Sequence, residues 1–262
     1  MLRHNEMRIT MTRTLVALMF GIVLSVGIEF PTVAEVVVGD GVKILEQKYH
    51  TPLTKDALVA ALRDNLPVVR GAAAARLAFS KEKDTVPSIL AALAIESSPS
   101  IKILFASSAA ELGAQEGFAA LRGMCRDSGW SSIDRMQAAN MMIGLENEDC
   151  LADVLNVLRS HDNNDAVNDA ANMAISILLQ HQHIPAEELP AIRGLAQVFL
   201  RSENHAIRAG ASDLLEKYGD SLSAEHLRGA LAVEQDEAVR KAMVAALRAL
   251  ETKPVASPGE EK

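Results

Sequence analysis

Residues 64–77 read D-N-L-P-V-V-R-G-A-A-A-A-R-L, and this stretch decides the fold. The apolar residue Val69 is followed at once by an arginine, then by small residues four and five positions later and a leucine eight positions later. Positions spaced in this way lie on one face of an α-helix, and small side chains let a helix approach its neighbours closely. The stretch therefore predicts a helix with one buried face.

The same pattern recurs along the chain, with its anchor at positions 69, 101, 134, 167, 207 and 239, and this anchor is apolar in every copy except at Asp134. A period of this length is typical of solenoids, in which each repeat packs against the next. Thr54 and Ser223 are expected to cap two of the first helices. An amphipathic stretch precedes each anchor: Lys55–Arg63, Val86–Ile95, Phe118–Cys125, Leu151–Leu158, Leu189–Leu200 and Ala224–Val233. The sequence predicts an all-α fold, an α-solenoid of about six helical hairpins.

The shared pattern, D-x-x-P-x-V-R-x-x-A-A-x-x-L, resembles the HEAT repeat, especially the short form of phycobilisome lyase-type HEAT-like proteins, over about residues 54–250. The resemblance implies that the basic residue after the anchor pairs with an acidic residue in the preceding turn, forming a ladder along the stack. Arg135 and Arg208 have no acid at the matching offset. The pairs that fit are Asp64/Arg70, Glu96/Lys102 and Glu234/Arg240. These residues are expected to be structural, and the lyase resemblance covers only the scaffold, so no enzymatic activity is expected.

The N-terminal residues differ from the rest of the chain. Three arginines precede an uncharged run over Thr14–Ile28, and Thr32-Val33-Ala34 offers small residues for signal peptidase. We expect a signal peptide at residues 1–34 and a secreted or periplasmic protein, whether translation starts at Met1 or Met11. An uncleaved membrane anchor remains the alternative, because the run is near the lower length limit for a span.

The remaining boundaries follow from composition. Residues 35–53 form an N-terminal segment, in which Val42–Gln47 is a candidate capping helix, and the repeat domain occupies residues 54–250. Residues 251–262 hold two prolines and almost no apolar side chain, so a disordered tail is expected there.

The formal net charge of −8 argues against nucleic acid as a partner, because phosphates favour basic surfaces. It also gives no reason for attraction to anionic lipid, and no membrane insertion is expected after signal cleavage. Only 3% of the residues are aromatic, which is low for a ligand pocket.

Cys125 and Cys150 are the two cysteines, and export would permit a disulfide between them. Cys125 is expected about ten residues into one helix, and Cys150 in the first turn of a parallel neighbouring helix. In that arrangement their Cα atoms are separated by more than the ~7 Å that a disulfide allows. We therefore expect two partly buried free thiols.

Few residues suggest chemistry. His181 and His183 lie beside Pro185 and are expected to be exposed loop histidines, and the acidic run from Asp162 lacks the glycine and glutamate of a calcium loop. No metal site and no cofactor is expected. An enzyme or enzyme-accessory protein, lyase-like or metal-dependent and using these residues, stays open as the alternative function.

The leading hypothesis is a non-catalytic scaffold that binds another protein on the inner surface formed by the second helices. A module that only supports assembly of an envelope complex is a further possibility. The candidate partner-binding residues are Ser107, Glu111, Gln137, Asn140, Asp213 and Glu216.

Overall fold

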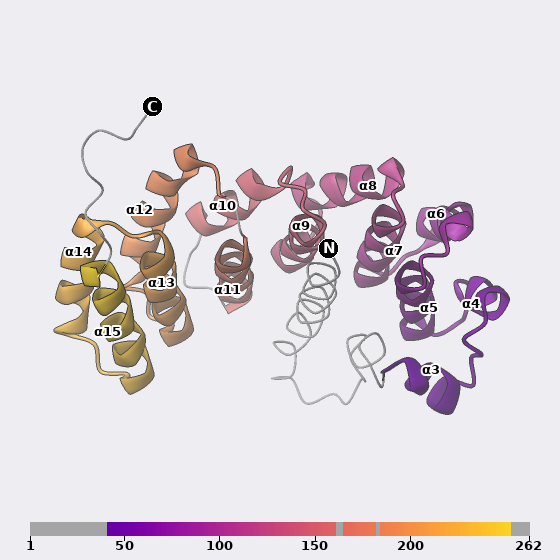
Figure 1. Ribbon diagram of the computed structural model, residues 1–262, viewed down its shortest axis with the longest axis horizontal. Coiled ribbons are helices and arrows are strands. Elements are labelled where there is room, and N and C mark those ends of the chain that lie inside the picture. The colour runs from indigo at the N-terminus through magenta and orange to yellow at the C-terminus, as the bar shows by residue number, and fades with distance from the viewer. Residues whose placement is uncertain (1–40, 161–164, 182–183, 253–262) are drawn as a thin grey trace. The chain divides into compact units, whose positions relative to one another are not determined.

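A computed structural model describes residues 41–160, 165–181 and 184–252 (Figure 1). Within these ranges the regular structure is entirely helical, without strands. Several predictions concern residues outside the described ranges. They are the signal peptide and its alternative as a membrane anchor, the roles considered for His183 and Asp162, and the part of the predicted tail at 253–262. In the part of the chain that is described, no helix has the length and apolar character needed to cross a bilayer.

Every predicted second helix is present and begins two residues before its anchor. These helices are α5 (Pro67–Phe79), α7 (Pro99–Glu111), α9 (Ser132–Gly144), α11 (Asp165–Gln180), α13 (His205–Tyr218) and α15 (Glu237–Thr252). The anchors Val69, Ile101 and Ile207 are at most 3% exposed. The apolar periodicity therefore identified both the helices and their buried face.

The first helices also form where the amphipathic stretches predict them. They are α4 (Lys55–Ala61), α6 (Val86–Ile95), α8 (Gln115–Arg126), α10 (Leu151–Arg159), α12 (Leu189–Phe199) and α14 (Ser221–Leu231), with short 3-10 turns at η2 (Lys83–Thr85) and η3 (Ala186–Glu188). Ser223 is not the N-cap that we expected, because α14 begins earlier and Asp220 caps it in a capping box with Ser223. Thr54 stands at the N-cap of α4 without a side-chain hydrogen bond. The described residues thus form the all-α array of helical hairpins that the sequence predicts.

The chain divides into two compact units, which we describe separately. Unit 1 consists of the described residues up to Trp130 and of Gln137–Cys150. In it, α4 and α6 pack on the second helices of their own hairpins, α5 packs against α7, and α7 against α8 (Figure 1). Helix α3 (Gly41–Tyr49) packs on α5, and Leu45 is fully buried in the same apolar core, so a helix does occupy the segment proposed as a cap.

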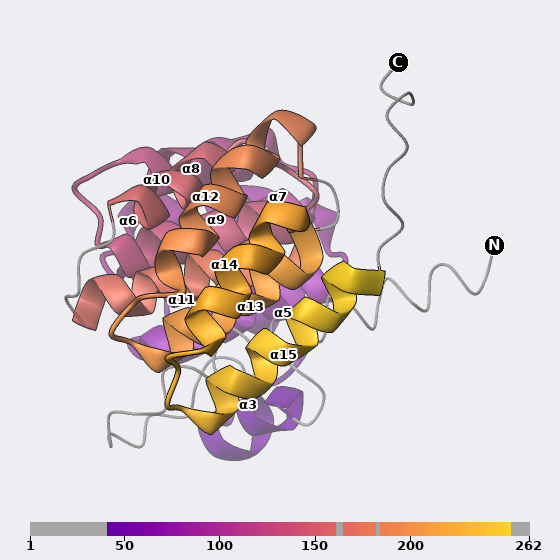
Figure 2. The same ribbon diagram turned by 90° about the vertical axis from the view of Figure 1, so that its left-hand side faces the viewer.

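Unit 2 consists of Ser131–Met136 and of the described residues from Leu151 onward. Its second helices α11, α13 and α15 pack in succession, and α12 packs against α14 (Figure 2). Helix α15 continues to Thr252, so the first two residues of the predicted tail are helical. The hydroxyl of Tyr218 and the ammonium of Lys217 donate to carbonyls at the end of α11, which satisfies groups that a helix C-terminus leaves free.

The close contact of α7 with α8 depends on Gly117. A Cβ atom there would lie 2.4 Å from the Ala110 nitrogen and 2.6 Å from the Ala106 oxygen. These are backbone atoms, which cannot move aside as a flexible side chain would. No larger residue fits this position without separating the two helices.

The prediction of free thiols is wrong, because Cys125 and Cys150 form a disulfide with their Cα atoms 6.2 Å apart. Cys150 precedes α10 and is not within its first turn, and the loop after α9 returns to the C-terminal turn of α8. The same turn holds the neighbouring Asp149: its carboxylate pairs with Arg122, and its carbonyl accepts a hydrogen bond from Arg126. The offset that we expected between the two cysteines does not exist.

Candidate functional site

Two buried ion pairs with the same geometry connect successive hairpins. In unit 1, Nε and Nη2 of Arg70 on α5 donate to both carboxylate oxygens of Glu96, at 2.7 and 2.8 Å. Glu96 lies in the turn after α6, which is the turn of the next repeat. Nη1 of Arg70 donates to the carbonyl oxygens of Asp64 and Asn65 in its own turn. One guanidinium therefore holds two consecutive turns together.

Unit 2 repeats this arrangement at Arg208 and Glu234. The two bonds between their side chains measure 2.6 and 3.0 Å, and Nη1 of Arg208 donates to the carbonyls of Ser202 and Glu203. Oε1 of Glu234 also accepts hydrogen bonds from the backbone N–H groups of Gln235 and Asp236. Both pairs join residues 26 positions apart.

The electrostatic consequence is a strongly stabilised carboxylate. The hydrogen bond from Arg208 outweighs the effect of burial and, with the two backbone donors, lowers the pKa of Glu234 from 4.5 to about 2. At Glu96, burial acts to raise the pKa, but the bonds from Arg70 and from the backbone of Ser98 and Ser97 outweigh it, and the pKa is lowered. Each glutamate is ionised in the folded protein at neutral pH.

The pairing differs from the ladder that the repeat pattern suggested. Glu96 and Glu234 pair with the arginine of the preceding repeat and not with Lys102 and Arg240 of their own. Nη1 of Arg240 donates instead to the carbonyls of Leu231 and Glu234. The carboxylate of Asp64 accepts from the Leu66 backbone, so Asp64 serves its own turn. The common 26-residue spacing of arginine and glutamate is the signal that would have identified the pairs.

The candidate partner-binding residues differ in exposure. In unit 1, Glu111 is exposed at the end of α7, Ser107 is half-buried with its hydroxyl bonded to the Leu104 carbonyl, and Gln137 is half-buried on α9. Asn140 is only 5% exposed, so it lacks the exposure that a candidate partner-binding residue needs. Three buried residues in succession, 138–140, show that α9 is covered over more than one stripe.

In unit 2, Asp213 and Glu216 are both exposed on α13. Desolvation by neighbouring atoms, followed by the charge of Glu216, raises the pKa of Asp213. Although Glu111 in unit 1 reaches solvent, desolvation raises its pKa as well. These three acids remain the exposed members of the predicted set.

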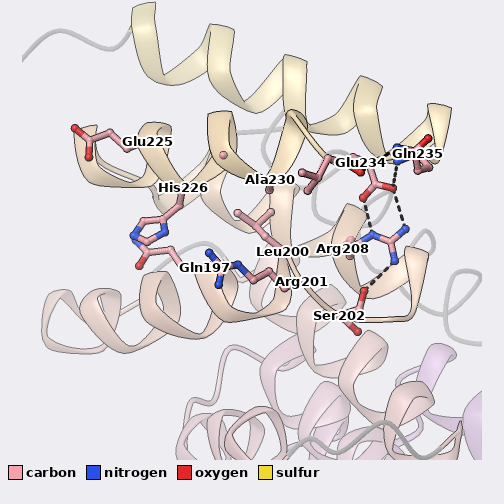
Figure 3. Close-up of a pocket in the computed structure, with 12 residues that line it drawn as sticks. Gln197, Leu200, Arg201, Ser202, Arg208, Glu225, His226, Ala230, Glu234 and Gln235 are labelled. Carbon is pink, nitrogen blue, oxygen red and sulfur yellow. Dashed lines mark hydrogen bonds and ion pairs between the residues drawn. The ribbon is translucent and has the colours of Figure 1, made fainter.

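A groove between α12 and α14 lies beside the Arg208–Glu234 pair (Figure 3). Gln197, Leu200 and Arg201 line it from α12 and the turn that follows, and His226, Ala230 and Val233 line it from α14 and its turn. Figure 3 shows Arg208 bonded to Glu234 at one end, with His226 and Gln197 facing each other at the other end. Sequence reasoning did not identify this groove, because its walls come from two repeats.

Of the residues considered for metal binding or catalysis, the structure describes His181 and Asp165. His181 is buried, not exposed as expected, and its carbonyl accepts hydrogen bonds from Lys217 and Tyr218. Asp165 begins α11. Among the described residues, no three His, Cys, Asp or Glu side chains gather closely enough to hold a metal ion.

Comparison with known proteins adds no relative: no protein-family model matches the chain, and no curated protein matches it.

Proposed function

We propose that this protein is a non-catalytic scaffold that binds another protein on its helical repeats, and that the repeats are of the HEAT type. The observation that carries the proposal is the double use of one turn design: Arg70–Glu96 and Arg208–Glu234 fix consecutive hairpins through buried, bidentate bonds. Rigid hairpins present their exposed side chains in a fixed arrangement, which lowers the entropy cost of binding a partner.

The exposed acids Glu111, Asp213 and Glu216 are the proposed contacts. The desolvated carboxylates of Glu111 and Asp213 favour a basic residue on the partner, because a cation would compensate the charge that they hold against desolvation. Other solenoid proteins bind partners along the faces of their second helices, so this part of the proposal is an analogy of fold.

In-cell crosslinking of the full chain, followed by purification and identification of the captured protein, tests the proposal. The variant changes Glu111, Asp213 and Glu216 to Lys. A charge-matched control changes three other exposed acids, Glu116, Glu187 and Glu203, to Lys. Capture by the wild type and the control but not by the variant is expected. If no specific protein is captured by the wild type, or if the variant captures it equally well, the proposed contacts are wrong.

We also propose that the protein works in an oxidising compartment, outside the cytosol. The Cys125–Cys150 disulfide supports this proposal, because cytosolic thiols are kept reduced in most organisms. Blocking free thiols at the moment of lysis, before denaturation and reduction, tests it by gel shift. The expected result is a protein with both cysteines protected, whereas free thiols in the folded protein would contradict the assignment.

A further inference from the structure

The groove between α12 and α14 combines free positive charge with an exposed aliphatic surface. Arg201 lies on one wall (Figure 3). Val233, which is 73% exposed, lines the groove from the turn after α14. Within the described residues, neither the Arg201 guanidinium nor the His226 imidazole has a hydrogen bond or an ion pair. Leu200 and Ala230 form apolar surface between them. The groove therefore offers a ligand both an unpaired cation and an exposed apolar surface.

The acidic residues beside the groove do not neutralise Arg201. The carboxylate of Glu234 is taken up by Arg208 and two backbone N–H groups. Glu225 points away from Arg201 at the outer edge of α14 (Figure 3). In a chain with a formal net charge of −8, the unpaired guanidinium of Arg201 is complementary to an acidic ligand group.

The positions of Arg201 and Val233 define a spacing. Each lies six residues before the anchor of its repeat, Ile207 and Val239, so they occupy equivalent places on neighbouring hairpins. Packed helices lie roughly 8–10 Å apart. An extended peptide advances ~3.3 Å per residue and its successive side chains point to opposite sides, so side chains three residues apart lie about 10 Å apart along the chain and face the two opposite walls of the groove.

The same pair recurs in unit 1 at the same register. Arg63 and Ile95 also lie six residues before their anchors, and both are exposed, Ile95 to 76%. The turns that carry them are the ones joined by Arg70 and Glu96. A cationic residue followed one repeat later by an exposed aliphatic residue therefore accompanies each of the two buried ion pairs.

We propose that the groove between α12 and α14 binds an extended peptide segment of a partner protein, in which an acidic residue stands three positions from an aliphatic one. The acid pairs with Arg201 and the aliphatic side chain covers Val233, while His226 and Gln197 hydrogen-bond the peptide backbone. The pair Arg63 and Ile95 provides a second site of the same kind. This inference rests on the proposed role in protein binding and adds the chemistry of the bound segment.

The probe is a phage-displayed library of short random peptides, selected on the full chain, followed by affinity measurement with the synthesised peptides. Enrichment of an acid three residues from an aliphatic side chain is expected. Arg201→Glu and Val233→Asp should each weaken binding roughly tenfold or more. Lys241→Glu, on the exposed surface of α15, is the charge-matched control and should leave binding unchanged.

Each outcome decides the proposal. Binding that is weakened by Arg201→Glu and weakened further in the double variant Arg63→Glu/Arg201→Glu supports it and assigns the remainder to unit 1. Failure to enrich any peptide, enrichment of sequences without the acid, or equal affinity of the double variant overturns it. The variant residues are exposed, and far-UV circular dichroism confirms that each variant folds.

The crosslinking experiment separates this inference from the broader proposal. If the variant with Arg201→Glu, Val233→Asp and Arg63→Glu still captures the partner of the wild type, the groove is not the docking site although the protein is a scaffold. If the wild type captures no partner, the proposed function itself fails.

Discussion

Replacing Glu234 with glutamine tests whether the buried pair with Arg208 stabilises the repeat array. The side chain of Glu234 is 5% exposed and that of Arg208 17%, so solvent screens the pair only weakly. Lowering the pKa of Glu234 from 4.5 to about 2 corresponds to about 3 kcal/mol of stability at neutral pH. Glutamine keeps the size of the side chain but accepts on one atom only and carries no charge.

The sign of the pH dependence follows from the lowered pKa. The folded state holds Glu234 ionised, so its contribution is complete above about pH 5 and disappears as the pH falls towards 2. The wild type and Glu234→Gln should differ in free energy of unfolding by about 3 kcal/mol at pH 7, and by about 1 kcal/mol at pH 3. Taking the difference removes the contribution of every carboxylate that the two proteins share.

Urea titration followed by far-UV circular dichroism at several pH values gives these energies, and hydrogen exchange in α13 and α15 assigns the loss to unit 2. Glu225→Gln, on an exposed site of α14, is the matched control and should change the free energy by less than about 0.5 kcal/mol. A Glu234→Gln variant no less stable than this control at pH 7, or a difference that does not shrink in acid, would refute the reasoning.

Four further substitutions probe three other features. Lys81 has φ 58°, a left-handed conformation that favours glycine. Lys81→Gly should therefore raise the free energy of unfolding by about 1 kcal/mol, measured as a higher melting temperature. A lower melting temperature would show that the backbone at Lys81 is not strained. Gly117→Ala should lower the free energy of unfolding, measured by urea titration, by more than about 2 kcal/mol. Gly123→Ala on the same helix, where nothing lies near the added Cβ, is the control and should raise that free energy by up to about 1 kcal/mol. Equal effects of the two substitutions would refute the close contact at Gly117. Burial raises the pKa of Tyr218 to about 12, so ultraviolet titration should show one tyrosine that ionises at unusually high pH and is missing in Tyr218→Phe. The same substitution removes the hydrogen bond to the Leu178 carbonyl and should lower the free energy of unfolding by about 1 kcal/mol. Since the neutral form is favoured in the folded state, the contribution of Tyr218 is lost between about pH 10 and 12.

The sequence predicted the helices well because helix formation at each position depends on nearby residues. The anchor fixes the buried face, and proline at the first position of α5 and α7 marks where those helices begin. These signals lie within about one repeat, so a single sequence is sufficient to read them.

Exposure was predicted less well, for a reason that three residues illustrate. Ser107, Asn140 and Asp213 each lie six residues after their anchor, yet the first is half-buried, the second buried and the third exposed. The register of a helix decides which side faces its own hairpin. How much of the remaining surface is covered depends on the packing of other segments, which the repeat pattern does not record.

The disulfide and the two ion pairs share a physical property that explains why local reasoning missed them. Each joins residues 25 or 26 positions apart, about one repeat minus the length of a turn. Within a repeat, an acid five residues before the anchor is near the arginine in sequence. The Nη1 group of the guanidinium nevertheless donates to local carbonyls, and its other donors point towards the next repeat. A planar group with donors on several edges can serve both directions, which a lysine such as Lys102 cannot do with one point charge. Repeats with arginine at this position and glutamate 26 residues later should therefore be the firmly joined ones, and Asn168, which takes the place of arginine in its repeat, marks a junction without this bond.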